Sequence, residues 1–324
     1  MLDVIILVKE GTKLCTNDLQ FGYKNGVSTS VCTAMVVETV SYYVNNGSHV
    51  YGLMLDASKA FDRVNYCHLF RKLMNRGLCP IYCRFLLNMY LGQKLRVRWE
   101  TTHSPYFSIS NGVKQGGVIS PILYCIYADG LLCRLQNAGI GCHMGSVYAG
   151  AFCYADDVKL LAPSVSALEH MINICENYAK EFDIMFNGKK SELIIYKCTK
   201  ARPSDPIIKV NNVQVPRNPK VTYLGHDLHE DIFSLPTEKC VANFNRQCNM
   251  FFSDFKYANT HIRNELFQKY CTSFYGSQIL PLYSNEMESI YCAWRKAIRK
   301  VWRVPYSTHC NILPYLANCM EIEL

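Results

Sequence analysis

Two apolar runs of this chain end in aspartate, and no other feature constrains its fold as strongly. Residues 50–55 (VYGLML) lead into Asp56, and residues 152–155 (FCYA) lead into the pair Asp156–Asp157. Such runs predict buried strands, and a carboxylate at the end of a buried strand is costly unless it is paired, hydrogen-bonded or bound to a cation. The sequence therefore predicts strand ends whose carboxylates together can hold metal ions.

The adjacent aspartates Asp156 and Asp157 repel each other, so a shared divalent ion is a natural partner. Carboxylate oxygens suit hard ions such as Mg²⁺, which keeps some water and completes its coordination with substrate phosphates. Two such ions roughly 3.5–4 Å apart would activate an attacking oxygen and stabilise a leaving one in phosphoryl transfer. The carboxylates alone leave an alternative open, in which they are solvated residues of a capped turn.

A glycine-rich loop lies between the two carboxylate positions. Residues 111–121 (NGVKQGGVISP) precede an apolar, helix-like run at 122–128, with Ser120 expected as the N-cap and Pro121 at the first helical position. Glycines let the backbone approach a ligand closely, and the start of a helix favours anions. Most such loops are simple turns. Its position between the two carboxylate positions favours a ligand-binding loop over a simple turn.

Three segments in this order, 55–62 (LDASKAFD), 114–121 (KQGGVISP) and 154–157 (YADD), resemble the palm motifs of reverse transcriptases from non-LTR retrotransposons of the LINE type, jockey-like. Further matches are 20–29 (QFGYKNGVST), 186–191 (FNGKKS) and 223–225 (YLG). The resemblance implies an α+β fold: a polymerase right-hand palm with an antiparallel sheet and packed helices, followed by a mostly helical thumb.

The resemblance also implies catalytic roles. Asp56, Asp156 and Asp157 would hold two Mg²⁺ ions, with Mn²⁺ as an alternative, on a strand end and on the turn of a β-hairpin. Lys190 aligns with the lysine proposed to protonate the pyrophosphate leaving group, which needs an ammonium near the developing charge. Lys189 beside it makes the register ambiguous, and either lysine can instead be a solvated charge.

By the same resemblance, four residues would contact the incoming nucleotide or the template: Phe61, Gln115, Gly116 and Tyr154. Phe61 lies five residues after Asp56, where the family carries a bulky side chain that blocks a ribose 2′-hydroxyl and so selects deoxynucleotides. The alternative for Phe61 is a core aromatic. Asp62 is expected to order its loop rather than to bind metal. Primer grip residues would be Tyr223, Leu224 and Gly225.

The implied function is that of an RNA-directed DNA polymerase, which transfers a nucleotide from a dNTP to a primer 3′-hydroxyl. Its partners would be an RNA template, a DNA primer or target, and dNTPs. About twenty residues precede Gln20, whereas the family has a longer upstream region, so we expect fingers that are largely missing. A fingers segment or an endonuclease on another polypeptide is then a candidate partner. The alternative is a truncated, catalytically inactive remnant that at most binds nucleic acid; a nucleotide cyclase is disfavoured by the Gln115–Gly116 string.

The resemblance divides the chain into three predicted parts: 1–48, a remnant of the fingers and palm entry; 49–230, a palm with the catalytic motifs and the primer-grip hairpin; and 231–324, a helical thumb with a C-terminal extension. Helices are expected at 28–44, 66–75, 80–91 and 166–183, strands at 49–56, 94–99 and 193–196, and a small hairpin at Asn211–Asn212.

A basic amphipathic helix is predicted near the C-terminus. Its apolar face would hold Ile290, Trp294, Ile298 and Val301, and its cations are Arg295, Lys296, Arg299, Lys300 and Arg303. Such a helix suits a thumb beside a template–primer duplex, although a membrane surface or a protein partner would also fit.

Composition is compatible with a polyanion-binding intracellular protein. The formal charge is +8, and seventeen cysteines occur without a C-x-x-C pair. Cysteines such as Cys125, Cys133 and Cys153 stand among apolar neighbours and are expected to be reduced core thiols, not zinc ligands. No apolar run approaches the length of a membrane span. We therefore expect action in the cytoplasm or nucleus and no membrane partner.

Overall fold

The computed structural model describes residues 2–198, 205–232, 238–271 and 285–318. The chain divides into two compact units, Met1–Val221 and Thr222–Leu324, and each has its own apolar core. The first unit combines helices with an antiparallel sheet, and the second is largely helical. This confirms the predicted α+β class, while the predicted three-part division stays a prediction.

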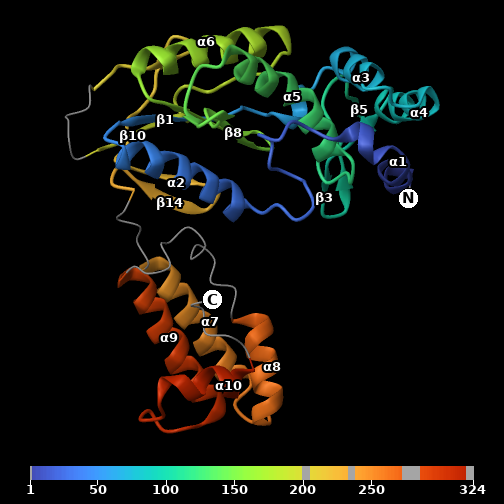
Figure 1. Cartoon of the computed structure of the whole chain (residues 1–324). Helices are drawn as coiled ribbons and strands as arrows, with labels where there is room; N and C mark the ends of the chain where they lie inside the picture. Colours follow the sequence, from blue (N-terminus) through green and yellow to red (C-terminus); the bar gives the residue numbers. More distant parts are fainter. Residues whose placement is uncertain (1, 199–204, 233–237, 272–284, 319–324) are drawn as a thin grey trace. The chain divides into compact units, whose positions relative to one another are not determined.

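A four-stranded antiparallel sheet forms the centre of the first unit, in the order β10-β1-β9-β8 (Figure 1). Its strands are β1 (Val50–Leu55), β8 (Ala151–Tyr154), β9 (Asp157–Ala162) and β10 (Glu192–Tyr196). Because β1 lies inside the sheet and both faces are covered by helices, its sequence is apolar on both sides rather than alternating. The predicted strands at 49–56 and 193–196 are confirmed.

The four helices predicted at 28–44, 66–75, 80–91 and 166–183 are confirmed within two residues at each end, and the helix-like run at 122–128 is part of a longer helix. The helices of the first unit follow in chain order. They are α2 (Thr29–Asn45), α3 (Tyr66–Asn75), α4 (Pro80–Tyr90), α5 (Ser120–Ala138) and α6 (Val165–Glu181), preceded by α1 (Leu2–Glu10) and the 3-10 turn Gly11–Leu14. Ser28 caps α2 by accepting a hydrogen bond from the backbone N–H of Val31. Helices α2 and α6 lie on opposite faces of the sheet (Figure 1).

The prediction that Ser120 caps α5 is wrong. The residue before the helix is Ile119, which has no capping side chain, and Ser120 lies inside the first turn. Ser120 is buried, and its hydroxyl lies 3.2 Å from the hydroxyl of Tyr90. The Ser120 hydroxyl therefore hydrogen-bonds to Tyr90 of α4 and not to the N–H groups of its own helix.

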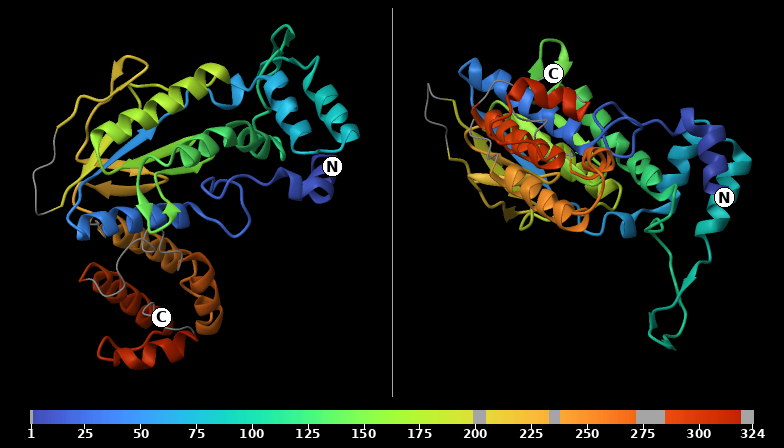
Figure 2. Two further views of the ribbon diagram at one scale, coloured as in Figure 1. Left: turned by 45° about the horizontal axis from the view of Figure 1, so that its top comes forward. Right: turned by 90° about the horizontal axis from the view of Figure 1, so that it is seen from below.

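The segment 94–99 does not form one continuous strand as predicted. It is broken into β2 (Lys94–Leu95) and β3 (Arg98–Trp99), which pair with β5 (Phe107–Ser108) and β4 (Thr102–His103). All residues of these four short strands are exposed. Figure 2 shows the arm that they form projecting from the rest of the first unit.

Two hairpins follow the sheet. Strands β11 (Lys209–Val210) and β12 (Val213–Gln214) pair around Asn211–Asn212, which confirms the predicted small hairpin. Strands β13 (Lys220–Tyr223) and β14 (His226–His229) form the second. Asparagine tolerates the left-handed conformation that such two-residue turns need, and both Asn211 and Asn212 have positive φ.

The second unit packs helices around aromatic residues. They are α7 (Glu238–Asp254), α8 (Thr260–Tyr270), α9 (Asn285–Trp302) and α10 (Leu313–Ala317), which follows the 3-10 turn Cys310–Ile312. The predicted apolar face of α9 is confirmed: Ile290, Trp294, Ile298 and Val301 are all buried. Among the described residues, none of the helices has the length and apolar character that crossing a lipid bilayer requires.

Cysteines of the described residues are free thiols, as predicted. Cys125 and Cys153 are buried in the first unit, whereas Cys133 is exposed, contrary to prediction. Cys133 lies on the face of α5 that meets the N-terminal segment, where its sulfur accepts a hydrogen bond from the Asn17 amide. Its apolar neighbours Leu131 and Leu132, in contrast, are buried.

A lysine lies inside the sheet. Lys159 of β9 is fully buried, pairs across the strands with Met54 and Phe152, and donates a hydrogen bond to the Tyr196 hydroxyl at 3.0 Å. Burial lowers the pKa of Lys159 from 10.5 to about 7. The unfolded chain therefore binds more protons than the folded chain between these two pH values, and the free energy of unfolding should rise with pH there.

Replacing the pair by Lys159→Met with Tyr196→Phe should remove this pH dependence, because no titrating amine and no unpartnered hydroxyl remain. Urea denaturation at several pH values from about 7 to about 9.5 should show a variant that is about 1–3 kcal/mol more stable at the lower pH, with the difference shrinking as pH rises. Lys94→Met, on the exposed arm, is the control. A parent with the same pH slope as the variant would contradict the prediction.

Candidate active site

The three predicted carboxylates meet at one end of the sheet. Continuing the β1–β9 register, in which Leu55 faces Val158, places Asp56 opposite Asp157. Asp156 stands in the tight turn that joins β8 to β9. Residues a hundred positions apart in sequence are thus neighbours, because β1 pairs with β9 of the β8–β9 hairpin. Their role as metal ligands stays a prediction.

The carboxylates influence one another electrostatically. Burial raises the pKa of Asp157 to about 6, helped by the negative charges of Asp156 and Asp56. The pKa of Asp156 is also raised, first by burial and then by the charge of Asp56. A negative charge that raises the pKa of another carboxyl lies within a short distance of it. The end of the sheet is therefore a site of concentrated negative charge.

The residues present fit a divalent cation. One carboxylate oxygen of Asp56, Oδ2, is enclosed and has no hydrogen-bond partner among the described residues. A buried carboxylate oxygen without a donor is unfavourable, and a bound cation would satisfy it. Within the same described part of the chain, no three His, Cys, Asp or Glu side chains already converge as a formed metal site. The side chains of Asp56, Asp156 and Asp157 would therefore have to rotate to coordinate an ion together.

A tight turn closes over the end of β1. The backbone N–H of Asn187 donates to the carbonyl of Asp56 at 2.9 Å, and the N–H of Asp56 donates to the hydroxyl of the buried Ser191 at 3.2 Å. This turn carries Lys189 and Lys190, which are both exposed. Either ammonium can reach solvent near the carboxylates, so the choice between the two lysines stays open.

Gln20 clamps the turn between β8 and β9. Its side chain is 1% exposed, and Oε1 accepts from the N–H groups of Gly22 and Ala155 at 2.9 Å each. Its Nε2 donates to the carbonyl of Ala155 at 3.2 Å. Ala155 has a positive φ of 57° and directly precedes Asp156. One amide thus holds both backbone groups of the residue that precedes Asp156 in this turn.

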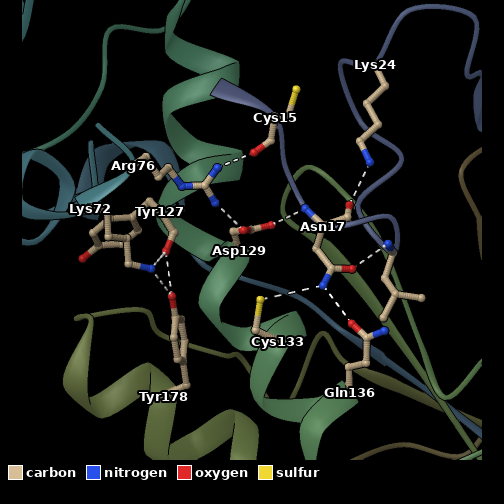
Figure 3. Close-up of polar contacts among 11 residues, drawn as sticks. Cys15, Asn17, Lys24, Lys72, Arg76, Tyr127, Asp129, Cys133, Gln136 and Tyr178 are labelled. Carbon is tan, nitrogen blue, oxygen red and sulfur yellow. Dashed lines mark hydrogen bonds and ion pairs between the residues drawn. The ribbon is translucent and has the colours of Figure 1, made fainter. Parts of the chain in front are cut away.

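The segment that carries Gln20 is anchored to α5 (Figure 3). The buried carboxylate of Asp129 accepts from the backbone N–H of Asn17 at 2.7 Å and pairs with Arg76, which also donates to the carbonyl of Cys15. The Asn17 amide donates to Gln136 at 3.0 Å. This network fixes the chain just before it runs alongside β8.

Phe61 lies on the border between the core and the site. It is half-buried, and its ring stacks on Tyr124 with 4.9 Å between the centroids. This packing holds the ring in one orientation, which suits a steric gate as well as the alternative of a core aromatic. Tyr154, at the end of β8 beside the turn, is also half-buried.

The glycine-rich loop is tied to the segment that follows Asp56. The N–H of Val113 donates to the carbonyl of Phe61 at 2.8 Å, and the exposed Gln115 amide donates to Asp62 at 3.1 Å. Asp62 thus orders this loop. Gly116 is exposed with φ of +80°, and a Cβ there would meet nothing within 4 Å. Glycine is the usual residue for this left-handed backbone conformation, and the contact of Gly116 with the nucleotide or the template stays a prediction.

The predicted primer-grip residues form the turn of the β13–β14 hairpin. Tyr223 ends β13 and is buried, while Leu224 and Gly225 have φ values of 49° and 82°. Two successive positive φ values are typical of the tightest hairpin turns. The primer-grip role of this hairpin stays a prediction.

Comparison with known proteins decides the family. Residues 6–228 match the sequence family described as reverse transcriptase (RNA-dependent DNA polymerase). The chain belongs to the reverse transcriptase family. This reverse transcriptase chain is 26% identical to the probable RNA-directed DNA polymerase from transposon X-element of Drosophila melanogaster. The aligned 211 residues cover 65% of this chain and 23% of the relative.

Two further relatives agree with the predicted resemblance to non-LTR retrotransposon reverse transcriptases, which is thereby confirmed. The RNA-directed DNA polymerase from mobile element jockey of Drosophila funebris is 26% identical over 226 residues, covering 68% of this chain and 24% of the relative. The Pol polyprotein from type-1 retrotransposable element R2 of Popillia japonica is 29% identical over 180 residues, covering 53% and 25%. The chain spans about a quarter of the length of these relatives.

Solved structures show the same fold for this reverse transcriptase chain. Telomerase from Candida albicans superposes with a TM-score of 0.54 at 11% identity, covering 99% of this chain and 58% of that protein. Telomerase from Candida tropicalis gives 0.52 at 11% identity, covering 99% and 53%. The predicted right-hand polymerase fold is therefore confirmed.

Sequence reasoning missed one positioning residue of this reverse transcriptase site. Gln20 was recognisable only as part of a matching string, because its partner Ala155 lies 135 residues away. The one local signal is the glycine at position 22, where an added Cβ would lie 2.6 Å from the backbone nitrogen of Ala155. A glycine without positive φ suggests such a close approach of backbones.

Proposed function

We propose that this chain catalyses RNA-directed DNA synthesis in a non-LTR retrotransposon, transferring a deoxynucleotide from a dNTP to a primer 3′-hydroxyl. The observation that carries the proposal is the meeting of Asp56, Asp156 and Asp157 at one end of the sheet, with an enclosed and unpartnered oxygen on Asp56. Membership of the reverse transcriptase family gives this constellation its chemistry. An RNA template, a DNA primer and dNTPs would be the substrates.

Asp56, Asp156 and Asp157 would hold two Mg²⁺ ions, with Mn²⁺ as a substitute. When bound, such ions supply charge neutralisation at the phosphates and make the primer hydroxyl a better nucleophile. The primer oxygen attacks the α-phosphorus, the bond to the bridging oxygen breaks, and pyrophosphate leaves. An ammonium from Lys189 or Lys190, on the turn fixed to the end of β1, would donate a proton to that leaving group.

The nucleotide would lie between the carboxylates and the glycine-rich loop. Asp62 accepts a hydrogen bond from the Gln115 amide, and the carbonyl of Phe61 accepts one from the N–H of Val113. The short segment after β1 therefore holds the glycine-rich loop in place. The Phe61 ring, held by Tyr124, would exclude a ribose 2′-hydroxyl. Preorganised positioning of this kind supplies much of the rate in phosphoryl transfer.

Primer extension tests the proposal. Purified protein with a primed RNA template, dNTPs and Mg²⁺ should lengthen the primer; a chelator should stop the reaction, and added Mg²⁺ should restore it. Ribonucleotides in place of dNTPs should give little product. A folded protein that binds the primed template without extending it would instead support the alternative, a catalytically inactive remnant that binds nucleic acid.

A further inference from the structure

The glycine-rich loop has an exposed tip between two buried ends. Residues 114–118, which form the tip, are exposed apart from the half-buried Gly117. The residues on either side of the tip, 112–113 and 119–120, are buried. An exposed segment of this kind is mobile unless the residues at both of its ends are fixed. The groups that fix these two ends therefore decide where the tip lies.

Tyr66 holds the first end of the tip. It is the first residue of α3 and is 6% exposed, and its hydroxyl donates to the carbonyl of Gly112 at 2.9 Å. The N–H of Gly112 donates to the carbonyl of Val64, also at 2.9 Å, so both backbone groups of this glycine are bonded. Gly112 has φ of +95°, and an added Cβ would lie 2.8 Å from the carbonyl oxygen of Asp62. The loop thus packs directly on the segment after β1, and a buried carbonyl would lose its donor without the Tyr66 hydroxyl.

Tyr90 holds the second end of the tip. It is the last residue of α4 and is 3% exposed, and its hydroxyl hydrogen-bonds to the Ser120 hydroxyl. Burial raises the pKa of Tyr90, and the Ser120 hydroxyl and the backbone N–H of Lys114 offset part of this rise. Both residues therefore lie close to the Tyr90 oxygen, although they come from opposite ends of the tip. An added Cβ at Gly117 would lie 2.5 Å from the Ser120 oxygen, so the backbone of the tip passes close to this hydroxyl.

Tyr66 and Tyr90 form a tyrosine pair. Their ring centroids are 5.7 Å apart and their planes are inclined by 49°, and the helices that carry them, α3 and α4, lie side by side (Figure 1). Buried aromatic rings at this spacing attract each other beyond the effect of their buried area. Asn65 caps α3 by accepting a hydrogen bond from the N–H of His68 at 3.3 Å, which fixes the start of the helix beside Tyr66. Both ends of the tip therefore depend on one pair of packed rings.

We propose that Tyr66 and Tyr90 are positioning residues, which hold the tip of the glycine-rich loop where it contacts the incoming nucleotide. The same loop is joined to the steric-gate residue, because the N–H of Val113 donates to the carbonyl of Phe61 at 2.8 Å. A tip that is already in place loses little conformational entropy when a ligand binds, whereas a loose tip must first be ordered. The two hydroxyls thus increase nucleotide affinity without touching the reacting atoms. The nucleotide rests on the proposed function, whereas the fixing of the loop does not require catalysis.

The first test removes only the two hydroxyls. Tyr66→Phe combined with Tyr90→Phe keeps both rings and their packing. Hydrogen–deuterium exchange of the whole chain without substrates should show the amides of residues 112–120 exchanging about 10-fold faster than in the parent, because buried bonds that close the loop are lost. Tyr148→Phe is the matched control. Tyr148 is also a buried tyrosine, and its hydroxyl donates to the carbonyl of Ile140 at 3.0 Å, outside the loop, so exchange at 112–120 should stay at the parental rate.

The second test measures nucleotide affinity without catalysis, on a primed RNA template whose primer ends in a dideoxynucleotide. With Mg²⁺ present, the dissociation constant of the next correct dNTP should rise about 10-fold in the double variant and by less than about 2-fold in Tyr148→Phe. In primer extension, KM for the dNTP should rise by a similar factor while kcat stays within about 3-fold of the parental value, since the tip binds substrate and transition state alike. A purely structural role would instead affect Tyr148→Phe to the same degree.

Three outcomes separate this proposal from the proposed function. Parental exchange of residues 112–120 in the double variant would overturn the proposal, whether or not the protein extends primers. Faster exchange with an unchanged dissociation constant for the dNTP would refute the role in nucleotide binding. A parent that binds the dNTP on the dideoxy-terminated primer more tightly than the double variant does, but never extends a primer with a 3′-hydroxyl, would leave the tyrosine pair standing and refute only the proposed function.

Discussion

Asp56→Asn should abolish primer extension, with a loss of at least about 10³-fold in kcat, because a metal-ligating carboxylate contributes several kcal/mol of charge stabilisation in the transition state. Asp56 ends β1 opposite Asp157, and its oxygen Oδ2 is enclosed without a donor. The same change should stabilise the metal-free fold by about 1 kcal/mol, since a neutral amide relieves repulsion among three carboxylates. Activity and stability would thus move in opposite directions.

Single-nucleotide extension kinetics and thermal unfolding with a chelator measure the two effects on one preparation. Glu169→Gln, an exposed carboxylate on α6, is the matched control and should change neither quantity. Asp157→Asn should behave like Asp56→Asn in kinetics, because it removes the carboxylate that faces Asp56 across the strands. An Asp56→Asn protein that keeps more than about a tenth of parental kcat would refute the catalytic role of this carboxylate.

Gln20→Met should lower kcat about 10- to 100-fold, although Gln20 touches neither the carboxylates nor a substrate. The change keeps the side-chain length and removes the three hydrogen bonds that hold the backbone of Ala155 and Gly22. The turn that carries Asp156 would then be free to shift, and a displacement of about 1 Å can cost about 100-fold in rate. The free energy of unfolding should also fall, by about 2 kcal/mol, because buried backbone groups lose their partners.

A Mg²⁺ titration of primer extension separates positioning from simple loss of stability. If Gln20 positions the turn, the variant should need more Mg²⁺ for half-maximal rate at a temperature where it is fully folded. Gln20→Glu is the informative companion, because it keeps an acceptor for both N–H groups but places an oxygen against the Ala155 carbonyl. Gln93→Met, an amide at the end of α4, is the control. Parental kcat and Mg²⁺ dependence in Gln20→Met would show that the clamp is dispensable.

The sequence by itself determined the local elements of this protein. Helices such as α2 and α3 could be predicted almost to the residue, because their caps and apolar spacing lie within a few turns of the chain. Strand β1 and the β8–β9 hairpin were predictable for the same reason, and so were the carboxylates at their ends. The order of the palm motifs further indicated the family. All of these signals act between residues that are close in sequence.

Only the tertiary structure decided which distant residues meet. The register that puts Asp56 opposite Asp157 depends on how β1 enters between β9 and β10, and the hold of Gln20 on Ala155 spans 135 residues. Ser120 has a sequence typical of a cap, yet its hydroxyl meets Tyr90. Propensity and periodicity describe one segment at a time, whereas burial and pairing depend on every segment that packs there. Long-range contacts therefore determined the clamp, the buried lysine and the tyrosine pair.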